Sequence, residues 1–128
     1  REQFGRPIAE FQGLQWIVAD MAIQIDAARL MVWRAAQSAD MTDSGFPDPH
    51  LAAQAKIFAS ETAVKVSNDA LQLHGARGYS RRNPVERMLR DARMFTIGGG
   101  TAQMLRNLVA GKILEMKTPQ TRGGYMKS

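Results

Sequence analysis

Two long stretches whose apolar residues repeat every three or four positions constrain the fold of this chain more than any other feature. This spacing gathers apolar side chains on one face of an α-helix, whereas a half-buried strand would need strict alternation. The first stretch begins at Pro7, which suits a first helical position, and continues to about Ala39. The second runs from Pro49 to about Leu73, directly behind an aspartate that can cap it. Residues 41–49 hold a glycine and two prolines, so we expect a loop between the two helices.

Two shorter helices are expected after the second long one. Asn83 and Pro84, with a glutamate three residues after the asparagine, form a typical helix start, and this third helix stops before Gly98. A fourth helix runs from about Thr101 to Met116, with the threonine as its cap. The sequence therefore predicts four helices separated by segments rich in glycine and proline.

These four helices fit one all-α domain, an antiparallel, up-down-up-down four-helix bundle over residues 1–117. Residues 118–128 are expected to form a loosely ordered tail. Eight methionines, and apolar residues on several helix faces, lead us to expect burial against other domains or identical subunits. Because the chain begins with Arg1 rather than methionine, we interpret it as the carboxy-terminal portion of a longer polypeptide.

Composition excludes several functional classes. The chain has no cysteine, so disulfides, thiolate nucleophiles and thiolate metal sites are ruled out, and no apolar run is long enough to span a membrane. His50 and His74 lack a carboxylate at metal-ligand spacing, which predicts no metal site. The net charge is +5, with six arginines between positions 77 and 93, but few aromatic residues lie among them. A solvated or subunit-facing surface is therefore preferred to a nucleic-acid site.

Two carboxylates are in settings that do not favour a catalytic role. Asp91 is flanked by Arg90 and Arg93, which favours a structural ion pair over a general base. Glu61 lies within the second helix and has no partner visible in the sequence.

The triplet Gly98-Gly99-Gly100 interrupts two helices and is followed by Thr101. Each glycine costs a helix about 1 kcal/mol, so three together mark a bend in the backbone and leave room for a close approach. The first N–H groups of the following helix favour a negative or electron-rich partner. A plain turn fits the same residues, and both interpretations stay open.

Several blocks of the chain, in the same order and spacing, resemble the carboxy-terminal domain of acyl-CoA dehydrogenases. They are residues 1–8 (REQFGRPI), 72–79 (QLHGARGY), 84–93 (PVERMLRDAR) and 97–103 (IGGGTAQ). The resemblance covers residues 1–117. It implies that a helical domain and a β domain precede this bundle, and that FAD binds between subunits of a homo-oligomer, usually a dimer of dimers. It further implies an acyl-CoA substrate, an electron-transfer flavoprotein as partner, and a cytoplasmic or mitochondrial-matrix location, of which we prefer the cytoplasm.

The same resemblance implies roles for individual residues. Arg1, Phe4 and Gln12 would help hold FAD, with the Arg1 guanidinium suited to a pyrophosphate. Against the adenosine half of a neighbouring subunit's FAD would lie Gln72, Leu73, Gly75 and Ala76. At the start of the fourth helix, Thr101 and Gln103 would contact FAD and Gly100 the substrate. Ala76 departs from the family, whose pattern has glycine there, so a tight approach of FAD would be hindered.

Gly99 is the larger departure. Many members of the family carry a glutamate there that removes the α-proton of the acyl-CoA, and glycine cannot accept a proton. We therefore assign no catalytic residue to this chain. The preferred interpretation is an FAD-dependent acyl-CoA dehydrogenase, inactive as this fragment, whose base lies outside it, as in isovaleryl-CoA-type members.

Three alternatives stay open beside that interpretation. The chain could belong to a non-catalytic subunit of a heteromeric dehydrogenase, to a helical assembly module without cofactor, or to a related flavoprotein such as a reductase of unsaturated acyl-CoA. The small residues of the loop would also leave space for a branched or cyclic acyl group.

Overall fold

The computed structural model describes residues 1–117, and the tail expected at 118–128 lies outside the described residues. The elements in chain order are β1 (Glu2–Gln3), β2 (Arg6–Pro7), the 3-10 helix η1 (Ile8–Glu10), α1 (Gln12–Gln37), the 3-10 helix η2 (Ser38–Met41), α2 (Pro49–His74), α3 (Ala76–Tyr79), α4 (Pro84–Phe95) and α5 (Ala102–Ile113). Five of these are α-helices, so the all-α expectation is confirmed for the described part of the chain.

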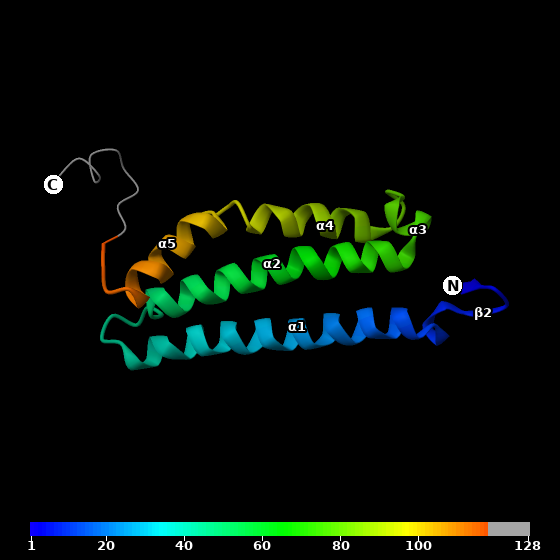
Figure 1. Ribbon diagram of the computed structural model, residues 1–128. Helices are drawn as coiled ribbons and strands as arrows, with labels where there is room; N and C mark the ends of the chain where they lie inside the picture. The colour runs from blue at the N-terminus through cyan, green and yellow to red at the C-terminus, as the bar shows by residue number, and fades with distance from the viewer. Residues whose placement is uncertain (118–128) are drawn as a thin grey trace.

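The long helix α2 is the centre of the arrangement. It packs against α1 on one side and against α4 and α5 on the other (Figure 1). The chain reverses between α1 and α2 and again between α2 and α4, as an antiparallel arrangement requires (Figure 1). After the glycine loop, α5 continues along α2 in the general direction of α4 (Figure 1). The described helices therefore form three layers, with α4 and α5 sharing the third.

The interfaces between the helices are built from small side chains. The buried apolar residues are Ala28, Ala35, Ala53, Ala55, Val85, Ala92 and Ala102. No large side chain among the described residues is fully buried. Small residues let helix axes approach closely, but each contributes little apolar area. The larger apolar side chains consequently lie near the edges of the interfaces or on outer faces.

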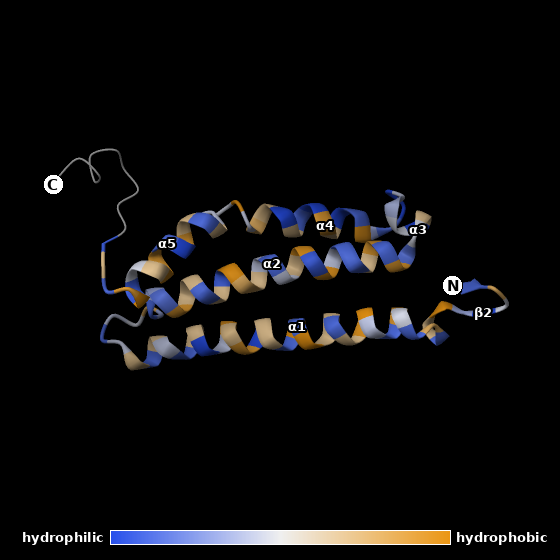
Figure 2. Ribbon diagram, viewed as in Figure 1, coloured by the Kyte–Doolittle hydropathy of each residue, from blue (hydrophilic) through white to orange (hydrophobic). Residues whose placement is uncertain are grey.

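Helix α1 carries the largest exposed apolar side chains. Trp16, Ile23, Leu30 and Trp33 are each more than 60% exposed, and apolar residues recur along the whole helix (Figure 2). Exposed tryptophans at this density are typical of surfaces that another protein segment covers. The expectation of burial against other domains or subunits agrees with this surface and stays a prediction. None of the described helices is both long and apolar enough to cross a membrane.

Local capping explains where α2 begins. The Asp48 carboxylate accepts hydrogen bonds from the N–H groups of His50 and Leu51, both at 2.9 Å, and Pro49 occupies the first turn. The hydrogen bond from Leu51 is the main reason that the pKa of Asp48 lies below its ordinary value. Buried Ser38 joins the preceding segment to this cap, because its Oγ donates to Ala35 O and accepts from Asp48 N.

The first helix starts later than the sequence analysis expected, at Gln12 rather than Pro7. The Phe4-Gly5 pair forms a tight turn, with φ of 54° and 74°, that pairs Glu2 with Pro7 in an antiparallel hairpin. Positive φ at both central residues matches the twist of a two-residue hairpin. Pro7 therefore lies in a hairpin strand, and the helix begins after it. At the other end of the bundle, α5 stops at Ile113, three residues before the expected Met116.

Candidate functional site

The glycine loop between α4 and α5 is a turn with a backbone hydrogen bond at each end. The N–H of Gly98 donates to Met94 O at 2.8 Å, and the N–H of Ala102 donates back to Thr96 O at 3.0 Å. Gly99 and Gly100 have φ of +67° and +88°, which side chains disfavour. A Cβ built on Gly99 would meet no atom within 4 Å, so the space beside this residue is open.

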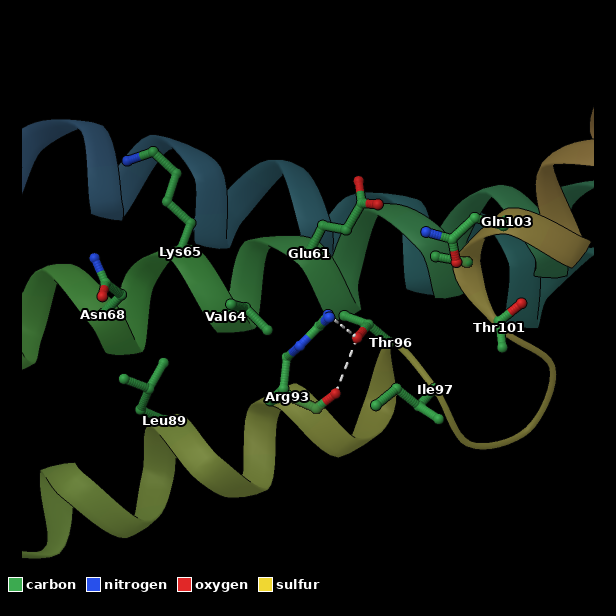
Figure 3. Close-up of a pocket in the computed structure, with 11 residues that line it drawn as sticks. Glu61, Val64, Lys65, Asn68, Leu89, Arg93, Thr96, Ile97, Thr101 and Gln103 are labelled. Atoms are coloured by element: carbon green, nitrogen blue, oxygen red, sulfur yellow. Dashed lines mark hydrogen bonds between the residues drawn. The ribbon is translucent and has the colours of Figure 1, made fainter.

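Thr101 caps α5, as its sequence position indicated. Its Oγ1 accepts a hydrogen bond from the N–H of Met104 at 3.2 Å. On the α4 side of the loop, Arg93 Nη1 donates to Thr96 Oγ1 at 2.5 Å, and that hydroxyl donates to Arg93 O at 2.9 Å (Figure 3). Both ends of the loop are therefore fixed by side chains close to it in sequence.

A cavity of about 390 Å³ lies between α2, the end of α4 and the start of α5 (Figure 3). Thr101 and Gln103, both assigned to FAD in the sequence analysis, line it together, whereas Gly100 lies outside its lining. The charged residues of its wall are Glu61, Lys65 and Arg93. A cavity with charges of both signs and an amide suits a polar ligand group more than a hydrocarbon chain.

Glu61 has the partner that the sequence did not reveal. Arg106 on α5 binds it with two hydrogen bonds of 2.7 and 2.8 Å, a bidentate geometry that joins α2 to α5. Arg106 holds the pKa of Glu61 below its ordinary value, mainly through the hydrogen bond. Both side chains are about half exposed. Glu61 therefore acts as an anchor for α5 and is ionised at neutral pH.

The other predicted residues gather at the C-terminal end of α2, around Gly75. This glycine ends α2 with φ 59° and ψ −142°, and a Cβ there would lie 2.2 Å from Arg1 Nη1. Arg1 Nη1 also approaches His74 O at 3.4 Å. The structure therefore brings Arg1 and Gly75 together within one chain.

The neighbours of this pair vary in their exposure. Phe4, at the tip of the hairpin, is 92% exposed, with only an edge-to-face contact to Phe11 at 6.2 Å. Gln12, Gln72 and Ala76 are also exposed. Leu73 points into an apolar hollow that it shares with residues of η1 and α1. Except for Leu73, these predicted residues are available to a ligand or a second subunit.

The two histidines have local partners, and one expected ion pair is absent from the described residues. No group of three metal-binding side chains occurs among residues 1–117. His50 and His74 each interact with a residue four positions away on α2, Gln54 and Ala70. Within the described residues Asp91 forms no ion pair, contrary to expectation, and Arg93, one of its two expected partners, donates to Thr96 instead.

Comparison with known proteins identifies the family. Residues 1–114 match the family model described as acyl-CoA dehydrogenase, C-terminal domain. The chain is 67% identical, over all 128 residues, to 3-sulfinopropanoyl-CoA desulfinase of Advenella mimigardefordensis and covers 31% of that protein. It thus spans about a third of the length of this relative.

Two solved structures have the same fold. Glutaryl-CoA dehydrogenase in complex with glutaryl-CoA superposes with a TM-score of 0.85 at 36% identity, covering 91% of this chain and 29% of the other. The FAD complex of PigA gives 0.80 at 29% identity, covering 88% and 29%. Because the family model matches nearly the whole described chain, this chain belongs to the acyl-CoA dehydrogenase family and corresponds to its C-terminal domain.

Proposed function

We propose that the full polypeptide carrying this domain binds FAD and removes the sulfinate group from 3-sulfinopropanoyl-CoA or a close analogue. The observation that carries this proposal is the 67% identity to a 3-sulfinopropanoyl-CoA desulfinase over every residue of the chain, against 36% to glutaryl-CoA dehydrogenase. Gly99 supports it, because this loop offers no carboxylate to take the α-proton that a dehydrogenation must remove.

The net reaction is balanced without an electron acceptor. Water enters, the C–S bond breaks, the sulfinate leaves as sulfite, and hydrogen replaces it on the acyl chain to give propanoyl-CoA. The acyl group therefore needs no net transfer of electrons to a partner protein. The electron-transfer flavoprotein implied by the family resemblance belongs to the alternative function, α,β-dehydrogenation with a base outside this fragment.

The predicted residues at the C-terminal end of α2 fit FAD chemically. Arg1 offers an exposed guanidinium beside the Gly75 backbone, a combination suited to a pyrophosphate. Phe4 and Gln12 are exposed and would help hold FAD. Gln72 and Ala76, also exposed, would contact the adenosine half together with Leu73. When bound, FAD supplies a two-electron redox centre beside the acyl chain.

At the other site, Thr101 and Gln103 would hold FAD from the start of α5, and Gly100 would border the substrate. The exposed apolar face of α1 supports assembly with the missing domains and with identical subunits in a homo-oligomer, a dimer of dimers. The Advenella relative is bacterial, which supports the cytoplasmic over the mitochondrial location.

The test uses the full polypeptide, purified with its flavin and supplied with 3-sulfinopropanoyl-CoA in the absence of any electron acceptor. We expect sulfite and propanoyl-CoA in equal amounts, measured by a colorimetric sulfite assay and mass spectrometry. Butyryl-CoA with an artificial acceptor is the matched control for dehydrogenation.

The other outcomes are distinct. Acceptor-dependent enoyl-CoA formation without sulfite would assign dehydrogenation instead. Bound flavin without turnover of either substrate would favour a non-catalytic subunit, and a purified protein without flavin absorbance would favour an assembly module.

A further inference from the structure

One side chain from the first third of α2 reaches the glycine loop. Lys56 Nζ donates a hydrogen bond to Gly100 O at 2.5 Å, across 44 positions of sequence. The half-buried lysine stem lies in an apolar groove whose lining includes Ala59, Ala63 and Phe95. Within residues 1–117, no other side chain from α1 or α2 donates to the glycine triplet.

The loop depends on such a contact because of its composition. Its ends are closed by the hydrogen bonds from Gly98 N to Met94 O and from Ala102 N to Thr96 O. Between these ends stand glycines, which have the widest choice of backbone conformations of any residue. A charge-assisted hydrogen bond to the Gly100 carbonyl selects one orientation of that peptide.

We propose that Lys56 is the positioning residue of this loop: its ammonium fixes the Gly100 carbonyl and so sets the path of residues 98–101 into the start of α5. Glu61, five residues further along α2, holds Arg106 on α5. Neighbouring turns of α2 thus anchor both the loop and the helix that follows it. Lys56 acts through the loop and does not itself touch cofactor or substrate.

Lys56 also affects the reaction, and this expectation alone rests on the proposed function. If Gly100 borders the acyl-CoA and Thr101 contacts FAD, a misplaced loop weakens substrate binding more than it slows the bound complex. We then expect KM to rise about tenfold in Lys56→Met with kcat changed less than about threefold.

The first measurement is hydrogen exchange on the full polypeptide loaded with FAD, which needs no turnover. Lys56→Met removes the charge and keeps most of the length, Lys56→Arg restores a cationic donor, and exposed Lys112→Met is the matched control. The reporters are the amides of Gly98, Ala102 and Met104, which are all hydrogen-bonded around the loop. We expect these amides to exchange about tenfold faster in Lys56→Met, with recovery in Lys56→Arg and no change in the control.

Unchanged exchange in Lys56→Met would overturn the proposal. So would faster exchange spread evenly over α2 with a lowered Tm, because Lys56 would then stabilise the whole bundle. Lys56→Gln is the second variant should Lys56→Met not fold, and the failure of both to fold would overturn it equally. A parent protein that turns over nothing, together with loop-confined exchange in the variant, would refute the proposed function and leave the role of Lys56 standing.

Discussion

Replacing Gly75 by alanine should damage stability and cofactor binding through two separable effects. Gly75 joins α2 to α3 with φ 59° and ψ −142°, a region that side chains enter only at a cost of about 1–3 kcal/mol. The new Cβ would also lie 2.2 Å from Arg1 Nη1 and 3.3 Å from its Cζ. Because Arg1 is exposed, its side chain will swing away rather than push the helix.

The second effect falls on the ligand that Arg1 would hold. A charge-assisted hydrogen bond contributes about 1.5–3 kcal/mol, so loss of the guanidinium contact should weaken FAD binding about 10- to 100-fold. The backbone strain should appear instead in the free energy of unfolding. Stability and affinity therefore report on different consequences of the same methyl group.

The assay is urea denaturation of the apoprotein beside fluorescence titration with FAD, both on the full polypeptide. Gly45→Ala is the matched control, since it adds a methyl at φ +68° with no atom within 4 Å of the new Cβ, in the loop between α1 and α2 and away from Arg1. Arg1→Met combined with Gly75→Ala completes a double-mutant cycle. Unchanged stability in Gly75→Ala would refute the strain argument. Additive effects of the two substitutions on the free energy of FAD binding would refute the steric link between Gly75 and Arg1.

Three further outcomes are expected from the described contacts. Glu61→Gln should lower Tm by no more than a few degrees, because the Arg106 pair is half exposed, and a double-mutant cycle at high salt should show the coupling shrink. The pKa of Asp48 is lowered in the folded state, so its stabilising effect is complete above the unfolded value of about 3.9 and is lost as pH falls through the folded value. The Tm of Asp48→Ala should therefore fall less steeply with decreasing pH than the Tm of the parent protein. Gly99→Glu has free space but costs about 1–2 kcal/mol at φ +67°, and should bring exchange of acyl-CoA α-protons in D₂O that the parent lacks. Mass spectrometry without such exchange would show that a carboxylate here does not reach the substrate.

The sequence predicted those parts of the fold that depend on local signals. The limits of α2 came within one residue because an aspartate cap, a first-turn proline and a terminal glycine lie next to the helix they delimit. Thr101 and Asn83 were recognised as caps for the same reason. The start of α1 was misplaced because Pro7 fits both a first helical turn and the hairpin strand where the structure has it.

Contacts between distant positions could not be predicted in this way. Lys56 reaches Gly100 across 44 residues and Glu61 reaches Arg106 across 45, and neither pairing leaves a periodic trace in a single sequence. The available signal for Lys56 was a cation set among alanines on a helix face that must pack. The contacts of individual residues with FAD and substrate stay predictions, because no local spacing in a single sequence specifies which atoms of a ligand a side chain meets.

The spacing of the two candidate clusters along α2 limits how they can share a cofactor. The cavity that Thr101 and Gln103 line meets α2 at residues 61–68, whereas Arg1 adjoins Gly75 just beyond the end of the helix. At 1.5 Å per residue, α2 separates the two clusters by about 10 to 21 Å. They can therefore bind two parts of one extended molecule or bind two molecules. The second arrangement follows naturally in a symmetric oligomer, where Thr101 and Gln103 would face one FAD while Arg1 and Gly75 together reach the FAD of a neighbouring subunit.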